Sequence, residues 1–74
     1  MLRDISTKVE VTINGEVREF TDSLSLPELL EQIEMNPRLI AVEYNGEILH
    51  RQFWESTKIK SGDRLEIVTI VGGG

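Results

Sequence analysis

The chain has 74 residues, no cysteine, one histidine and a net charge of −5 from 13 acidic and 8 basic residues. A single domain of this length buries only about 60% of the surface that its unfolded chain exposes, which leaves no room for a large enclosed substrate cavity. The absence of cysteine from the sequence excludes thiol catalysis, cysteine-based zinc sites and iron–sulfur clusters. We therefore expect the function to reside on the surface or at an end of the chain.

Charge and hydropathy indicate which partners to expect. An acidic balance opposes binding to nucleic acid or to a membrane with anionic lipid and favours a protein partner with a basic face, although mixed charge also simply keeps a small domain soluble. No apolar run approaches the roughly 20 residues that cross a bilayer, and residues 1–6 lack the core of a signal peptide. We expect a cytoplasmic protein that is a monomer when free.

The first predicted element is a β-hairpin. Residues 7–13 alternate between polar and apolar side chains, as in a strand with one buried face. Asn14-Gly15 follows, and this dipeptide favours the positive φ angles of a two-residue type I′ turn. Residues 16–21 can then return as the second strand.

A helix is predicted to begin at Ser25-Leu26-Pro27-Glu28. The Ser25 hydroxyl can cap free amide groups, proline is tolerated in the first turn, and Glu28 completes a capping box. Helical spacing produces an apolar stripe of Leu26, Leu29, Leu30 and Ile33 and a wet face of Glu28, Glu31 and Glu34. Asn36-Pro37 is expected to stop the helix, because proline lacks an amide donor and restricts the residue before it.

The second half of the chain is predicted to be mostly strand. Residues 39–44 form a short interior strand, Asn45-Gly46 repeats the turn signal, and residues 47–49 return. Residues 50–60 are predicted to form an irregular crossing segment. Its expected apolar anchors are Phe53, Trp54 and Ile59.

Ser61-Gly62-Asp63 is predicted to turn the chain into its last strand, residues 64–71. This strand is rich in β-branched residues and is expected to be central in the sheet. Because side chains alternate along a strand, they form two sets: Leu65, Ile67 and Val71 toward the helix, and Arg64, Glu66, Val68 and Ile70 outward. Apolar surface then lies next to the end of the chain, unless an extra layer or a neighbouring strand buries it.

The order of these elements predicts an α+β fold with a mixed four- to five-stranded sheet packed on one main helix. Conventional catalytic constellations are absent from the sequence. His50 has no cysteine nucleophile to activate and no second histidine to share a metal, so an exposed loop residue is the favoured interpretation. The glutamates of the predicted helix favour a solvated face over acid–base chemistry. We expect no catalytic residue and no metal ligand.

The remaining feature is the ending Val71-Gly72-Gly73-Gly74. A phosphate-binding glycine loop must run into a helix, so this ending is not such a loop. Glycine has no β-carbon, so a flexible tail of residues 72–74, after a domain of residues 1–71, can pass through a narrow slot and present its α-carboxylate to ATP. With a reference pKa of about 3.3 to 3.7 that carboxylate is ionised at neutral pH. The alternative interpretation is a frayed end or an expression remnant.

The sequence resembles the ThiS-type sulfur carriers of thiamine biosynthesis, small proteins with the ubiquitin-like β-grasp fold. The matching segments are Ile13-Asn14-Gly15-Glu16, the helix 26–33, the stretch 41–48, Arg51, Trp54, Gly62-Asp63, Ile67-Val68 and the ending Val71-Gly72-Gly73-Gly74. Each segment is weakly specific, whereas their order, spacing and ending are more specific and cover nearly the whole chain. Residues 1–6 and His50 depart from the family pattern.

The resemblance implies a protein cosubstrate rather than an enzyme. In such a family a ThiF-type adenylating enzyme uses ATP and magnesium to adenylate the terminal glycine, a sulfur donor protein converts the adenylate to a thiocarboxylate, and thiazole synthase takes the sulfur. Carried over to this chain, which is expected to bind no cofactor itself, Gly74 holds the adenylate and then the thiocarboxylate, and Gly72 and Gly73 form the tail. Val68 and Ile70 are expected to dock the partner enzymes, an assignment that comes from strand parity.

Two other functions stay open at this point. The same chemistry can serve molybdopterin, the tungsten cofactor or a thiolated transfer RNA, although the length, the Asn-Gly hairpins and the Val-Gly-Gly-Gly ending favour the thiamine branch. A different class is a non-covalent β-grasp binding module whose tail takes part in no reaction.

Overall fold

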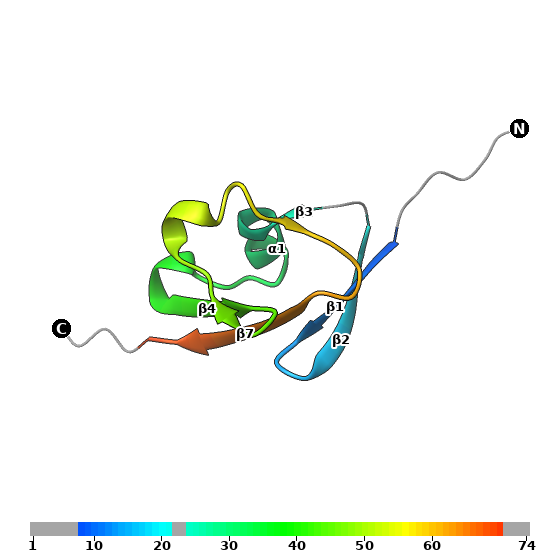
Figure 1. Ribbon diagram of the computed structural model, residues 1–74, viewed down its shortest axis with the longest axis horizontal. Coiled ribbons are helices and arrows are strands. Elements are labelled where there is room, and N and C mark those ends of the chain that lie inside the picture. The colour runs from blue at the N-terminus through cyan, green and yellow to red at the C-terminus, as the bar shows by residue number, and fades with distance from the viewer. Residues whose placement is uncertain (1–7, 22–23, 71–74) are drawn as a thin grey trace, which may run out of the picture.

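Five strands form one mixed sheet that carries a helix on one face, in a computed structural model that describes residues 8–21 and 24–70 (Figure 1). In chain order the elements are β1 (Lys8–Ile13), β2 (Glu16–Thr21), β3 (Leu24–Ser25), α1 (Leu26–Gln32), β4 (Ile40–Tyr44), β5 (Glu47–Ile48), β6 (Lys58–Ile59) and β7 (Arg64–Thr69). Short 3₁₀ turns lie at Pro37–Leu39 and Arg51–Phe53.

The strand order of the sheet is β2-β1-β7-β4-β5, so β7 is central, as predicted. β1 and β7 run parallel, and the other neighbours are antiparallel. This arrangement confirms the predicted α+β architecture. A second, two-stranded sheet of β3 and β6 was not predicted, and it attaches the start of α1 to the crossing segment through the pair Leu24↔Ile59.

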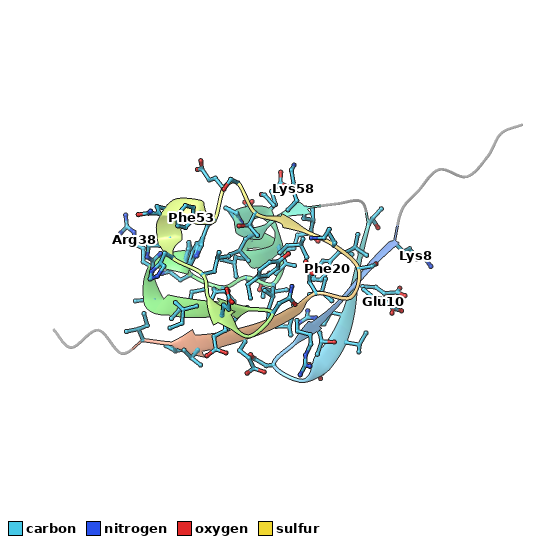
Figure 2. All side chains as sticks on the ribbon, viewed as in Figure 1. Lys8, Glu10, Phe20, Arg38, Phe53 and Lys58 are labelled. Atoms are coloured by element: carbon cyan, nitrogen blue, oxygen red, sulfur yellow. The ribbon has the colours of Figure 1, made fainter. Side chains whose placement is uncertain are left out.

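The hydrophobic core lies between the inner face of the sheet and α1. Its buried members are Val9, Val11, Ile13, Phe20, Leu26, Leu29, Leu30, Ile40, Val42, Trp54, Ile59, Leu65 and Ile67. Figure 2 shows Phe20 inside the molecule, whereas Lys8 and Glu10 on the neighbouring strand project outward. The predicted helical stripe is therefore the face that packs, and each fully buried Leu of α1 contributes on the order of 1.5–3 kcal/mol by leaving water.

Local signals set both hairpin turns and the start of the helix. Asn14 and Gly15 have φ angles of 53° and 84°, as a type I′ turn requires, and the turn at 45–46 repeats this geometry. The predicted capping box is present: the Ser25 N–H donates to Glu28 Oε1 (2.9 Å), and the Glu28 N–H donates to Ser25 Oγ (3.4 Å). The hydrogen bond from the Ser25 N–H, followed by the nearby Ser25 side chain, holds the pKa of Glu28 below its ordinary value.

The helix ends earlier than predicted, at Gln32 rather than at Asn36-Pro37. Glu34 takes a left-handed conformation (φ 62°), its N–H donates to the Glu31 carbonyl (3.1 Å), and the Met35 N–H donates to the Leu30 carbonyl (3.0 Å). These two bonds form a Schellman motif, which usually has glycine where Glu34 stands. The half-buried Met35 packs against the core and compensates for the less favourable residue.

Three predicted strand boundaries and one core residue also differ. The interior strand begins at Ile40, the return strand ends at Ile48 and the described part of the last strand ends at Thr69. The prediction that Phe53 anchors the crossing segment is wrong, since this side chain is 48% exposed, whereas Trp54 is buried as predicted. The 3₁₀ turn allows only one of these adjacent rings to point inward, and Trp54 also donates its Nε1–H to the Leu49 carbonyl (2.9 Å).

Asp63 is a buried carboxylate that joins two loops. Its oxygens accept hydrogen bonds from the Tyr44 hydroxyl (2.6 Å), the Lys60 N–H (2.8 Å) and Asn45 Nδ2 (3.2 Å). Burial alone would raise the pKa of Asp63, but these bonds and the charge of Lys60 together hold it below its ordinary value. Burial, followed by the hydrogen bond to Asp63 and its charge, raises the pKa of Tyr44 to about 12. The sequence indicated only a turn at this position.

This network predicts a pH-dependent stability. Because the folded pKa of Asp63 is below the unfolded value of about 3.9, its contribution is present above that pH and is lost as the pH falls through the folded pKa. Asp63→Asn should lower the free energy of unfolding by roughly 1–3 kcal/mol at pH 7, measured by urea denaturation, and the difference from wild type should shrink below pH 4. The control is Glu47→Gln at an exposed position. A difference that stays constant down to pH 2 would contradict this role of the carboxylate.

Candidate functional site

Exposed apolar side chains gather on the outer face of the sheet, where β7 approaches the end of the described chain. Val68 is 57% exposed, Ile70 46% and Ile48 67%. The pairs Ala41↔Val68 and Glu43↔Ile48 place β4, β5 and β7 side chains on this one face. They line two adjoining hollows, and we call Ala41, Ile48, Val68 and Ile70 the apolar patch.

The predicted parity of β7 agrees with the structure at every position the structure describes. Leu65 and Ile67 are buried against the helix, and the outward set of Arg64, Glu66, Val68 and Ile70 is exposed. Within residues 8–21 and 24–70, no layer or neighbouring strand covers Val68 or Ile70. Sequence reasoning missed Ile48, although a two-residue turn at 45–46 sets its register opposite Glu43 and could have placed it on this face.

Opposite charges border the apolar patch at its two ends. Glu43 and Glu66 are directly opposite each other on β4 and β7, and both line the hollow beside Val68. Like charges in such a pair repel each other, and Arg64 on the same outward face lines a hollow together with both carboxylates. At the other end His50 and Arg51 line the hollow beside Ile70.

Arg51 holds the chain beside the apolar patch. Its guanidinium donates to the carbonyls of Pro37 (2.6 Å) and Ile40 (3.1 Å) and lies over the Trp54 ring, 4.7 Å from its centroid. These contacts tie the crossing segment to the start of β4. Arg51 therefore has a structural role, and His50 is an exposed residue at the start of the 3₁₀ turn.

Asn14 has a role that its turn preference did not reveal. The Ile67 N–H donates to Asn14 Oδ1 (2.7 Å), and Asn14 Nδ2 donates to the Ile67 carbonyl (3.1 Å). The side chain thus continues the β1–β7 ladder by one step after the β1 backbone has turned away. This contact helps to fix the path of β7 toward the chain end.

The predicted reactive residues Gly72, Gly73 and Gly74 lie outside the described residues, as do Val71 and residues 1–6. The last described contact of β7 is the hydrogen bond from the Ile70 N–H to the Leu39 carbonyl (2.6 Å). In the described part of the chain, no group of three or more His, Cys, Asp or Glu side chains is placed to hold a metal ion. No helix in that part has the length and apolar character that crossing a bilayer requires.

Comparison with known proteins decides the family. Residues 11–74 match the model of the ThiS family. The chain belongs to the ThiS family. The resemblance seen in the sequence is therefore confirmed, and the match includes the three terminal glycines.

Solved ThiS structures share the fold. The crystal structure of the thiamine biosynthesis protein ThiS from Geobacter metallireducens is 33% identical and superposes with a TM-score of 0.78 over 89% of this chain and 100% of that one. The solution structure of a thiamine biosynthesis protein from the same organism gives a TM-score of 0.73. The predicted β-grasp fold is thereby confirmed.

Two curated relatives differ in length. The uncharacterized protein ycf40 of Trieres chinensis is 41% identical over 70 residues, which are 95% of this chain and 96% of that protein. A thiazole synthase of Paramagnetospirillum magneticum is 38% identical over 66 residues, which are 89% of this chain but only 20% of that protein. ThiS-like sequence thus also occurs as about a fifth of a longer chain.

The outward placement of Val68 and Ile70 in this ThiS-family member predicts tolerance to charge. Val68→Lys and Ile70→Lys should each change the free energy of unfolding by less than about 0.5 kcal/mol, because neither side chain leaves water on folding to a large extent. Ile67→Lys on the same strand is the control and should cost several kcal/mol or prevent folding, because its site is 4% exposed. Urea denaturation at pH 7 measures all three. Unfolding of the Val68 and Ile70 variants would show that these residues belong to the core.

Proposed function

We propose that this protein is a sulfur carrier of thiamine biosynthesis and that the carboxylate of Gly74 is its reacting group. The ThiS-family match, which continues through residue 74, is the observation that carries the proposal. The similarity to part of a thiazole synthase supports the thiamine branch, because it joins ThiS-like sequence and that synthase in one polypeptide. The protein then acts as a cosubstrate rather than as an enzyme.

The proposed chemistry takes place on the last residue, inside partner enzymes. A Gly74 carboxylate oxygen attacks the α-phosphorus of ATP, and pyrophosphate leaves; a ThiF-type enzyme holds the nucleotide and magnesium. Hydrosulfide (HS⁻) released by the sulfur donor protein then attacks the carbonyl carbon of the acyl-adenylate, AMP leaves with the electron pair of the broken C–O bond, and the sulfur loses its proton to solvent. The product is a thiocarboxylate, whose sulfur thiazole synthase consumes. Glycine suits this position because the carbonyl has no side chain beside it.

The mass of the intact protein tests the reaction. Incubation with ATP, magnesium, the ThiF-type enzyme and a sulfur donor should shift the mass by one exchange of sulfur for oxygen, and fragmentation should place the change at Gly74. Deletion of Gly74 and addition of one alanine after it are matched controls, and each should abolish the shift while leaving the fold intact. No shift in the wild type, with an enzyme that is active on another ThiS protein, would refute the proposal.

We also propose that the apolar patch docks the partner enzymes. Val68 and Ile70 are close in sequence to the reacting end, and exposed apolar groups with a polar border are typical of transient interfaces. The opposed carboxylates of Glu43 and Glu66 favour a basic group on the partner. This agrees with the basic partner face expected from the net charge.

Charge on the apolar patch should weaken docking. Val68→Lys or Ile70→Lys should lower kcat/KM for adenylation, followed as pyrophosphate release, by about tenfold, which corresponds to a lost contact of about 1.4 kcal/mol. Val17→Lys is the matched control, because Val17 is 65% exposed on the same sheet face but lies on β2, at the far edge. That variant should stay within twofold of wild type. Equal losses in all three variants would indicate a general charge effect and contradict docking at the apolar patch.

A further inference from the structure

One edge of β7 becomes free before the described chain ends. β1 pairs with β7 only at Thr12↔Arg64 and Ile13↔Leu65, and then turns away into the hairpin. β4 covers the opposite edge of β7 from the pair Tyr44↔Leu65 to the pair Ile40↔Thr69. Figure 1 shows β7 continuing past β1 and β2 toward the C-terminal side of the molecule.

The backbone groups of Thr69 point toward this free edge. Along a strand, the N–H and C=O groups of successive residues project to alternate sides. The Ile70 N–H points to the side of β4 and donates to the Leu39 carbonyl. The N–H and C=O of Ile67 point to the side of β1, and the Asn14 side chain bonds both of them. Thr69 faces the same side as Ile67 and is exposed, and no described residue makes a hydrogen bond to its N–H or C=O.

This free edge lacks the features that normally prevent strand pairing. Exposed edges are usually protected by charged side chains, proline or bulges. The outer strand β2 follows that rule, with Glu16, Arg18 and Glu19. The segment Val68-Thr69-Ile70 has no charge and no proline, and its three β-branched residues have high strand propensity. The open edge of β7 is therefore suited to an additional strand.

We propose that an extended segment of the ThiF-type activating enzyme pairs with the free edge of β7 at Thr69. The inference rests on the proposed function and adds a second contact to it. The occupant follows from position: Thr69 is five residues before the reacting Gly74, a span of at most about 18 Å, so the enzyme that binds the chain end is the partner within reach of this edge. The edge adjoins the apolar patch, but the two surfaces face different ways. Pairing would use the Thr69 backbone groups, which lie in the plane of the sheet, whereas docking would use the Val68 and Ile70 side chains, which project from its outer face.

An amide-to-ester replacement tests the pairing. The 74-residue chain is made by chemical ligation with the Val68–Thr69 peptide bond replaced by an ester bond, so that an oxygen stands where the Thr69 N–H was. Because this N–H has no partner in the described part of the protein, the free energy of unfolding should change little. Loss of one intermolecular hydrogen bond should lower kcat/KM for adenylation by about 2- to 12-fold.

The matched control is an ester at Glu19. In a two-residue hairpin Glu16, Arg18 and Phe20 bond to β1, so the Glu19 N–H points to the outer edge of β2, far from β7. This ester should leave kcat/KM unchanged. A Thr69 ester with the kcat/KM of the Glu19 ester would overturn the proposal.

Hydrogen exchange gives an independent test on the unmodified protein. The Thr69 amide should exchange fast in the free protein and at least tenfold more slowly in the complex with the activating enzyme, whereas the Ile67 amide should be slow in both. An unchanged Thr69 rate in the complex would overturn the pairing. Protection that grows with the concentration of the protein alone would show that a second copy occupies the edge, and would also overturn it. Failure of the proposed function has a different result, which is that wild-type Gly74 is not adenylated.

Discussion

The central position of β7 is the constraint on which the candidate site depends. β7 pairs with β1 on one side and with β4 on the other, and Leu65 and Ile67 fix its inner face against the helix. Once those two side chains are buried, alternation requires Val68 and Ile70 to face outward. The last described residue after β7, Ile70, therefore lies in the apolar patch itself. Moving β7 by one residue would bury the apolar patch and expose the core, so one register determines both stability and presentation.

Two side chains maintain this register where the backbone cannot. Asn14 bonds the Ile67 backbone after β1 has turned, and Asp63 accepts three hydrogen bonds at the turn that leads into β7. One clamp lies at each end of the β1–β7 contact. Asn14 takes the place of a ladder partner for Ile67, whereas Asp63 satisfies the Lys60 N–H within its own turn and ties that turn to Tyr44 and Asn45. The strand is thereby held at both ends although its parallel pairing with β1 involves only two residue pairs.

The sequence predicted the features whose causes are local. The Asn-Gly turns, the capping box at Ser25 and the parity of β7 depend on neighbours in the chain, and the structure agrees with each of them. The early helix end at Glu34 was not predicted, because its signal is usually glycine and the compensating Met35 contact lies in the core. The burial of Asp63 and the exposure of Phe53 depend on contacts with other segments, which no local pattern contains.

In the candidate site, too, the sequence predicted the features with local causes and missed those that depend on contacts between segments. Strand alternation was sufficient for Val68 and Ile70, but the site also includes β4 and β5, whose register against β7 is a tertiary property. Ile48 and the opposed pair Glu43 and Glu66 therefore became visible only in the folded chain. Predicting the free edge at Thr69 requires still more tertiary information, because this edge is defined by the residue at which β1 stops pairing with β7 and by the hydrogen bonds of Asn14.

The small size of the apolar patch has a consequence under the proposed function, in which the protein visits several enzymes. Four side chains cover much less than the roughly 800 Å² per partner of a stable interface, so docking on this face alone would be weak and would dissociate fast. Fast dissociation suits transfer between an activating enzyme, a sulfur donor and a synthase. Docking through so small a surface, however, would leave the orientation of the domain on the enzyme poorly defined. The backbone contact proposed at the adjoining edge would act in a second direction and restrict rotation about the apolar patch, so that the domain could be oriented without a large interface.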